Sequence, residues 1–298
     1  ECSEMGTVRN DGSHLCFYAD CNRQKYILAP FFISLIAFMS ENGKVSVVIP
    51  CYNHEKYLRD TVLSVLNSDY SSLEVIIVND GSTDRSEQIA LELVGQYPEL
   101  RYIAQENRGP SAARNAAIGL ANGKYILPLD ADDLIGPFYI RQAVELLEKE
   151  NARLVYCEAE FFGEKNGKWV LPPFSRRKLA CENMIFCSAL YLREDWLRCG
   201  GYDETMTWGW EDWEFWISLL KEGGCVLKVP GTGFFYRISK NSRRKSTNRE
   251  AKNKTVALIN SKHRDFVYEQ LSGPLRRNRS LSRIINLLLK NLGLLKLN

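Results

Sequence analysis

Three carboxylates crowd into four residues of the sequence, at Asp130-Ala131-Asp132-Asp133. Negative charges this close repel one another unless something positive neutralises them. A hard divalent cation does so with oxygen ligands, and Mg²⁺ or Mn²⁺ that holds a diphosphate is the usual arrangement. The run follows an apolar segment that reads as a strand, where ligands of parallel sheets gather. It therefore predicts a metal site formed by Asp130, Asp132 and Asp133, with a helix-capping acidic turn as the alternative.

A second acidic pair, Glu211 and Asp212, lies at the start of a predicted helix over residues 211–221. The helix dipole favours ionised carboxylates at this end. One of the two can therefore accept a proton from a hydroxyl group. Trp208 and Trp210 precede the helix, where exposed indole faces can stack on a sugar. Plain helix capping is the alternative for the acidic pair.

Two further segments could contact a nucleotide. Asn79-Asp80-Gly81-Ser82 forms a turn after a predicted strand, and Asp80 sits where hydrogen bonds can read a base or a ribose. Arg114 lies near the start of a predicted helix, whose N-terminus and guanidinium group could face a diphosphate. A strand-to-helix turn and a surface arginine are the respective alternatives.

The composition excludes other chemistries. Only three histidines occur in 298 residues, which disfavours a histidine-rich zinc site, so carboxylates must carry any acid–base work. The net charge of +3 gives no reason to expect nucleic acid, and Arg243-Arg244-Lys245 stands without a nucleic-acid module. The six cysteines from Cys51 onward have no CxxC spacing, which is typical of reduced thiols in a cytoplasmic enzyme.

Strand and helix patterns alternate through the first half of the chain. Strands are predicted over 45–49, 73–78, 101–104 and 124–129, and helices over 55–66, 84–94, 112–121 and 137–150. This order implies βαβ units and an α/β fold, in which the strand-end loops meet at one edge of a parallel sheet. The second half is less regular, with strands expected over 154–162, 187–192, 226–229 and 234–237.

Together, four segments resemble the family 2 glycosyltransferases, which are inverting, nucleotide-sugar-dependent enzymes of the GT-A fold. They occur in family order within residues 44–237 as VSVVIPCYNHEKYL, EVIIVNDGSTD, NRGPSAARNAAIGLANGKYILPLDADD and GGYDETMTWGWEDWEFW. The resemblance implies one GT-A domain over residues 39–270, with a Rossmann-like, mostly parallel central sheet flanked by helices.

The resemblance also implies how the donor is bound. Pro50, Tyr52 and Asn53 are expected to contact the nucleoside of a nucleotide-sugar, most readily a UDP-sugar, with Asp80 on the base. Arg114 lies in the segment that lines the diphosphate in this family.

The same resemblance implies the catalytic roles. Asp130 and Asp132 match the DxD motif that touches ribose and a divalent cation, and Asp133 is adjacent. Asp212, paired with Glu211, matches the base that deprotonates the acceptor hydroxyl. That hydroxyl, on a glycan or a lipid-linked oligosaccharide, would attack the anomeric carbon in line and invert its configuration.

One departure from the family pattern keeps two alternatives open. Many relatives carry a histidine near the metal in a Tyr-Arg-x-His run, but here Tyr236-Arg237-Ile238 is followed by Ser239. This permits a degenerate nucleotide- or glycan-binding module without turnover. A sugar nucleotidyltransferase of the same fold is the other alternative, although it normally has a glycine-rich, basic loop after the first strand.

Residues 1–38 carry their own expectation. They contain most of the apolar run Ile27–Met39, which at thirteen residues is too short to span a bilayer as a helix. Met39 then leads straight into the first predicted strand. We expect residues 1–38 to be a non-native or disordered extension, with a membrane-associating segment as the alternative.

The other end of the chain is strongly basic. Residues 237–298 hold 16 Lys and Arg against three acids, a net charge of +13, whereas residues 1–236 sum to −10. Apolar residues at helical spacing predict a basic amphipathic helix over residues 271–298. Residues 275–298 could lie on an anionic membrane and place a cytoplasmic enzyme peripherally on its inner face. A helix docked on the protein body is the alternative.

Overall fold

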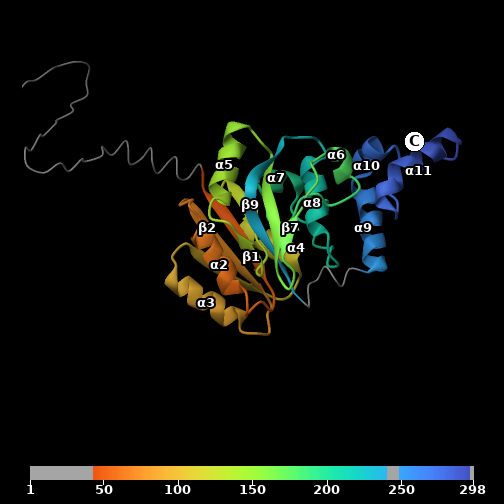
Figure 1. Cartoon of the computed structure of the whole chain (residues 1–298). Coiled ribbons are helices and arrows are strands. Elements are labelled where there is room, and N and C mark those ends of the chain that lie inside the picture. Colours follow the sequence, from red (N-terminus) through yellow and green to blue (C-terminus); the bar gives the residue numbers. More distant parts are fainter. Residues whose placement is uncertain (1–42, 240–247, 296–298) are drawn as a thin grey trace, which may run out of the picture. The chain divides into compact units, whose positions relative to one another are not determined.

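The computed structural model describes residues 43–239 and 248–295, which lie in one compact unit. The expectation for residues 1–38 and the last three residues of the predicted C-terminal helix lie outside them. The described strands form one sheet (Figure 1). Their spatial order is β3 (Leu100–Gln105), β2 (Leu73–Asp80), β1 (Val45–Cys51), β4 (Tyr125–Pro128), β8 (Leu190–Leu192), β6 (Leu154–Gly163), β9 (Val226–Ile238) and β5 (Leu134–Ile135), and β7 (Gly167–Trp169) pairs with β6. No helix in these ranges is both long and apolar enough to cross a membrane.

The first half of the chain builds a parallel sheet. It contains β1 (Val45–Cys51), β2 (Leu73–Asp80), β3 (Leu100–Gln105) and β4 (Tyr125–Pro128), connected by α2 (Leu58–Leu66), α3 (Ser86–Gln96) and α4 (Pro110–Gly119). All pairings among these four strands are parallel. The apolar side chains of β1 and β2 are buried, which is why continuous β-branched runs suit them. The predicted α/β fold is confirmed, and the carboxyl ends of β1, β2 and β4 share one edge.

The second half extends this sheet with mixed pairing. It contains β5 (Leu134–Ile135), α5 (Tyr139–Lys149), β6 (Leu154–Gly163), β7 (Gly167–Trp169), α6 (Arg176–Leu179), β8 (Leu190–Leu192), α7 (Arg193–Cys199) and β9 (Val226–Ile238). β8 runs antiparallel to both β4 and β6, whereas β9 runs parallel to β6. The two strands expected over residues 226–237 are therefore one, because bulges in the β6–β9 register absorb the Pro230–Gly233 interruption.

Helix α8 (Glu211–Leu220) is buried on nearly every side. Trp213 and Trp216 belong to the core, as their helical spacing predicts. Their indole N–H groups donate to the carbonyl oxygens of Leu179 (2.7 Å) and Ile185 (3.1 Å). The first turn of α8 is therefore held at a fixed position beside the sheet.

The described C-terminal residues form four short helical elements, and within the helix predicted over residues 271–298 the regular α-helix is limited to the last of them, after a 3₁₀ turn. The four elements are α9 (Arg249–Lys262), α10 (Arg264–Leu271), the 3₁₀ turn η2 (Arg279–Leu281) and α11 (Ser282–Asn291). The break follows α10, where Ser272 takes a left-handed φ of 55° and Gly273-Pro274 follows.

A buried ionic network joins these helices to α8. Glu214 is fully buried and lies 2.6 Å from His263 Nε2 and 3.0 Å from Lys262 Nζ. Burial works to raise the pKa of Glu214, but the bond from His263 and the charge of Lys262 prevail and lower it. The network ties α9 and α10 to the helix that carries the predicted base.

Candidate active site

The loops after β1 and β2 are hydrogen-bonded to each other at the carboxyl edge of the sheet. Asn53 adopts a left-handed φ of 58°. Its Oδ1 accepts a bond from the Thr83 amide (2.8 Å), and its own amide donates to Ser82 Oγ (3.0 Å). Tyr52 beside it is 47% exposed, and Pro50 is half-buried at the end of β1. The exposed ring of Tyr52 can therefore stack on a flat partner such as a base.

Asp80 ends β2 and is almost fully buried. Its carboxylate accepts hydrogen bonds from Gln105 Nε2 (2.7 Å) and from the amides of Arg108 (2.9 Å) and Gly109 (2.8 Å). Asp80 therefore shapes the loop that enters α4. A carboxylate offers about four lone-pair sites, so contact with a base stays a prediction for this residue.

Arg114 is the central cation of the site. Its guanidinium donates through one nitrogen to Asp130 Oδ1 (2.6 Å) and through another to Glu211 Oε1 (3.0 Å). The side chain is 3% exposed, and the guanidinium lies over the ring of Tyr202. One buried arginine thus links the acidic strand-end loop to the acidic helix start. Contact of Arg114 with a diphosphate stays a prediction.

The pKa values of the three aspartates in the strand-end loop are shifted in different directions. Burial acts to raise the pKa of Asp130, but the charge and hydrogen bond of Arg114 prevail and lower it. Burial, opposed by His54 and reinforced by the charge of Asp130, raises the pKa of Asp132. Burial and then the charges of Asp132 and Asp130 raise the pKa of Asp133 well above its usual range. The loop therefore holds more negative charge than its surroundings neutralise.

This loop has the donors that a hard divalent cation prefers. Asp133 Oδ1 accepts a bond from the Arg237 amide (2.8 Å), but its buried Oδ2 has no hydrogen-bond partner among the described residues. Ligand atoms of Asp130, Asp133 and Cys187 lie within 4.8 Å of one another. The carboxylate oxygens fit Mg²⁺ or Mn²⁺, whereas burial raises the pKa of the Cys187 thiol well above its usual range and keeps it protonated.

The cluster differs from the predicted metal set in one member. Asp130 and Asp133 are in it together with Cys187, whereas Asp132 is not, so Asp132 stays a predicted ligand. The Cys187 thiol lies 3.5 Å from Asp130 Oδ2. Nothing in the sequence around residue 187 signals this contact, because 57 residues separate it from Asp130. The charge of His54 works to lower the pKa of both Asp130 and Asp132. His54 is likewise absent from the predicted site.

Asp212 has the properties of a general base. Its Oδ2 accepts a hydrogen bond from Asn183 Nδ2 (2.8 Å) and its Oδ1 accepts one from the Trp213 amide (2.8 Å). Burial first and the charge of Glu211 second raise the pKa of Asp212 to about 6. A carboxylate with this pKa is ionised at neutral pH, yet binds a proton more readily than an ordinary aspartate.

The indole faces of Trp208 and Trp210 are less open than expected. Both side chains are half-buried. Trp208 Nε1 donates to Thr255 Oγ1 on α9 (2.9 Å), and the guanidinium of Arg279 lies 5.5 Å from the ring centre of Trp210. The expectation of exposed faces is therefore wrong in degree, because the C-terminal helices cover part of each ring.

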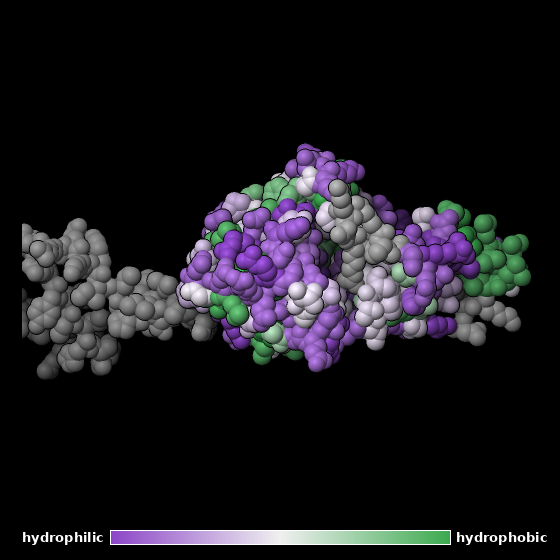
Figure 2. All heavy atoms as spheres, turned by 90° about the horizontal axis from the view of Figure 1, so that it is seen from below, coloured by the Kyte–Doolittle hydropathy of each residue, from purple (hydrophilic) through white to green (hydrophobic). Residues whose placement is uncertain are grey.

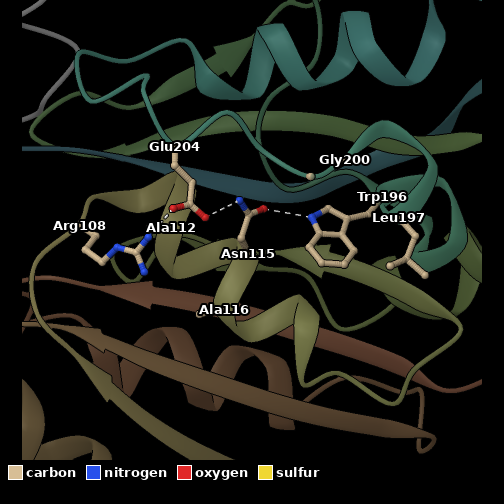
Figure 3. Close-up of a pocket in the computed structure, with 9 residues that line it drawn as sticks. Arg108, Ala112, Asn115, Ala116, Trp196, Leu197, Gly200 and Glu204 are labelled. Atoms are coloured by element: carbon tan, nitrogen blue, oxygen red, sulfur yellow. Dashed lines mark hydrogen bonds and ion pairs between the residues drawn. The ribbon is translucent and has the colours of Figure 1, made fainter.

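Asn115, next to Arg114, secures the segment that leads to Asp212. Its side chain donates to Tyr202 O (2.8 Å) and Glu204 Oε1 (3.0 Å) and accepts from the Tyr202 amide (2.9 Å) and from Trp196 Nε1 (3.1 Å). A pocket of about 500 Å³ opens here (Figure 3). Glu204 lines this pocket, but Asp130, Glu211 and Asp212 do not.

Comparison with known proteins assigns a class to this site. The chain is 34% identical over 163 residues to the glycosyltransferase YibD of Escherichia coli, which is 54% of this chain and 45% of that protein. It is 32% identical over 188 residues to chondroitin synthase of Pasteurella multocida, covering 60% and 19% of the two chains. The chain therefore spans less than half the length of either relative.

Solved structures share the fold. S. aureus TarS in complex with UDP-GlcNAc superposes with a TM-score of 0.64 at 20% identity, covering 83% of this chain and 76% of that one. The mannosyltransferase PcManGT from Pyrobaculum calidifontis, in complex with GDP-Man and Mn²⁺, gives 0.57 at 19%, covering 90% and 89%. The predicted GT-A fold is confirmed. More narrowly, glycosyl transferase family 2 matches residues 46–209, and the chain belongs to that family.

Proposed function

We propose that the protein transfers a sugar from a nucleotide-sugar, most readily a UDP-sugar, to a hydroxyl group of a glycan or lipid-linked acceptor, with inversion. The observation that carries this proposal is the double ion pair of Arg114. Because one guanidinium contacts both Asp130 and Glu211, the donor side and the acceptor side of a transfer reaction lie one side chain apart. An in-line displacement needs this proximity.

The protein's own residues supply the proton chemistry. Asp212 accepts the proton of the acceptor hydroxyl as its oxygen forms a bond to the anomeric carbon. The bond from that carbon to the diphosphate oxygen breaks with its electron pair, and nucleoside diphosphate leaves. Attack opposite the leaving group inverts the configuration, and Asn183 orients the accepting carboxylate through its 2.8 Å hydrogen bond.

A divalent cation completes the donor site in this proposal. Asp130, Asp132 and Asp133 would hold Mg²⁺ or Mn²⁺. The buried Oδ2 of Asp133, which has no hydrogen-bond partner in the described part of the chain, supports the fit. Such an ion supplies Lewis-acid stabilisation of the charge that develops on the leaving diphosphate. Ser239 in place of a family histidine is consistent with a site whose carboxylates are its main ligands.

The nucleoside is assigned to the loops after β1 and β2. Tyr52 would stack on the base with Pro50 and Asn53 beside it, and Asp80 would hydrogen-bond the base edge. The complexes of TarS with UDP-GlcNAc and with UDP support a uridine donor, whereas the GDP-Man complex of PcManGT makes a guanosine donor the second one to test.

The acceptor is assigned to the segment before α8. The remaining exposed parts of Trp208 and Trp210 would pack on the acceptor sugar close to Asp212. Chondroitin synthase among the relatives supports a glycan acceptor.

The experiment measures release of nucleoside diphosphate by the full chain from UDP-, GDP- and dTDP-sugars, with Mn²⁺, Mg²⁺ or EDTA. We expect turnover that needs the cation. Asp212→Asn should lower it by roughly 10²–10⁴-fold with nucleotide binding retained, and Asp132→Ala should weaken cation-dependent binding. Asp69→Asn, in a remote ion pair with Arg141, is the control. Full activity of Asp212→Asn would refute the base assignment, and binding without turnover of any donor would favour a binding module.

A further inference from the structure

Helix α11 turns its polar side inward. Asn286 and Ser282 are fully buried. The Asn286 amide nitrogen donates to the carbonyl oxygens of Leu271 (3.0 Å) and Pro274 (2.9 Å), and its oxygen accepts from Arg276 Nε (2.7 Å). Ser282 Oγ accepts from the amide of Arg276 (2.9 Å). Buried hydrogen bonds, which are strong away from water, hold this helix to the body.

The opposite side of α11 and the residues after it present an apolar surface to solvent. Exposed fractions rise along a leucine stripe of five residues: Leu281 42%, Ile284 57%, Leu288 57%, Leu292 69% and Leu294 71%. The first four recur at steps of three and four and share one helical face. Figure 2 shows the apolar patch at the same end of the molecule as α11 in Figure 1. Exposed apolar patches of this kind mark interaction surfaces.

The charge around the stripe has one sign. Residues 270–295 contain no Asp or Glu, and Arg277, Arg283 and Lys290 are exposed. Arg283 and Lys290 lie at steps of three and four from Asn286, so they flank the stripe and do not share its face. A second copy of the chain on the stripe would place two segments without Asp or Glu against each other. An anionic bilayer instead offers an apolar interior and negative headgroups together. Charge complementarity therefore selects the lipid surface.

We infer that the leucine stripe with Arg277, Arg283 and Lys290 is a docking surface for an anionic membrane, used in the folded conformation seen here. Because Asn286 and Ser282 already fix the helix, no rearrangement is needed to expose the leucines. Arg279 connects the surface to the site, since its guanidinium lies over the rings of Trp210 and Trp213. Docking would bring the segment before Asp212 close to a lipid-linked acceptor. The inference does not depend on the proposed transfer reaction.

The test is flotation of the full chain with vesicles of phosphatidylcholine alone or mixed with phosphatidylglycerol. We expect binding to the anionic vesicles only. The stripe variant Ile284→Ser/Leu288→Ser/Leu292→Ser should lose it. The charge variant Arg277→Gln/Arg283→Gln/Lys290→Gln should bind on the order of a hundredfold more weakly. The matched control Leu91→Ser/Leu120→Ser/Val170→Ser removes exposed apolar residues elsewhere and should bind like wild type.

Two readouts keep the result interpretable. Thermal unfolding of the stripe variant should match wild type, since its three side chains are exposed, and this excludes misfolding as the cause of lost flotation. All variants keep the apolar run Ile27–Met39, so equal flotation of wild type and stripe variant would overturn the inference. The inference would also be overturned if the wild-type chain did not bind vesicles and light scattering showed a dimer that the stripe variant does not form.

Discussion

The hydrogen bond from Asn183 to Asp212 makes a quantitative prediction about pH dependence. Asn183 Nδ2 lies 2.8 Å from Asp212 Oδ2 and favours the ionised carboxylate, whose pKa burial and Glu211 raise to about 6. A hydrogen bond to a charged group contributes about 1.5–3 kcal/mol. Since one pKa unit corresponds to about 1.4 kcal/mol, Asn183→Leu should raise the pKa of Asp212 by roughly one to two units.

The assay is the pH profile of kcat/KM with a saturating divalent cation. A base must be unprotonated to act, so wild-type kcat/KM should rise about tenfold per pH unit up to about pH 6 and then level off. In Asn183→Leu the acidic limb should move to roughly pH 7–8. Activity lost at pH 6.5 should return in part at higher pH. Asn291→Ala, at the exposed end of α11, is the control and should leave the limb in place.

Two outcomes would refute this reasoning. If Asn183→Leu lowers kcat/KM equally at every pH, Asn183 orients the acceptor and does not tune the base. If the limb is present in Asp212→Asn as well, it belongs to another group. Comparable unfolding temperatures for wild type and variant are required before either profile is interpreted.

Two other variants test the framework around the carboxylates. Arg114→Lys keeps the charge, but one ammonium cannot reproduce the fork that reaches both Asp130 and Glu211, so kcat should fall on the order of 10²-fold. Denaturant unfolding of Arg114→Met should show a loss of about 3–5 kcal/mol, because two carboxylates lose their shared partner; wild-type stability would contradict the network. Asn115→Ala removes four hydrogen bonds and should speed amide exchange over residues 202–207, whereas Ala116→Ser in the same pocket should not.

The sequence predicts the parallel half of the sheet well, and the reason is local. β1 and β2 are continuous β-branched runs that are buried, so period and composition agree with the final environment. The same hydrophobic patterns place the acidic run at the end of a strand and the acidic pair at the start of a helix. Family resemblance then supplied their order and roles, and the structure places Arg114 between them.

The remaining site residues come from segments without periodicity. Asn183 and Cys187 lie between α6 and β8 and contact Asp212 and Asp130. No pattern predicts an element at Asn183, and the strand predicted over residues 187–192 begins only at Leu190, so Cys187 precedes it. The sequence pattern does not predict the orientation of α11 either. Apolar periodicity predicts a helix but not which face turns inward, and here the buried residues are Asn286 and Ser282.

The buried contact of Glu214 with Lys262 and His263 limits where this chain can be truncated or joined to a related chain in a chimaera. The family match ends at residue 209, before α8 begins. The partners of the buried Glu214 on α8 are nevertheless Lys262 and His263, more than fifty residues beyond the end of the match. A chimaera joined at residue 240 would leave that carboxylate buried without its cation, at a cost of about 3–5 kcal/mol. A segment that keeps this buried contact therefore extends at least through His263, some fifty residues beyond the matched segment.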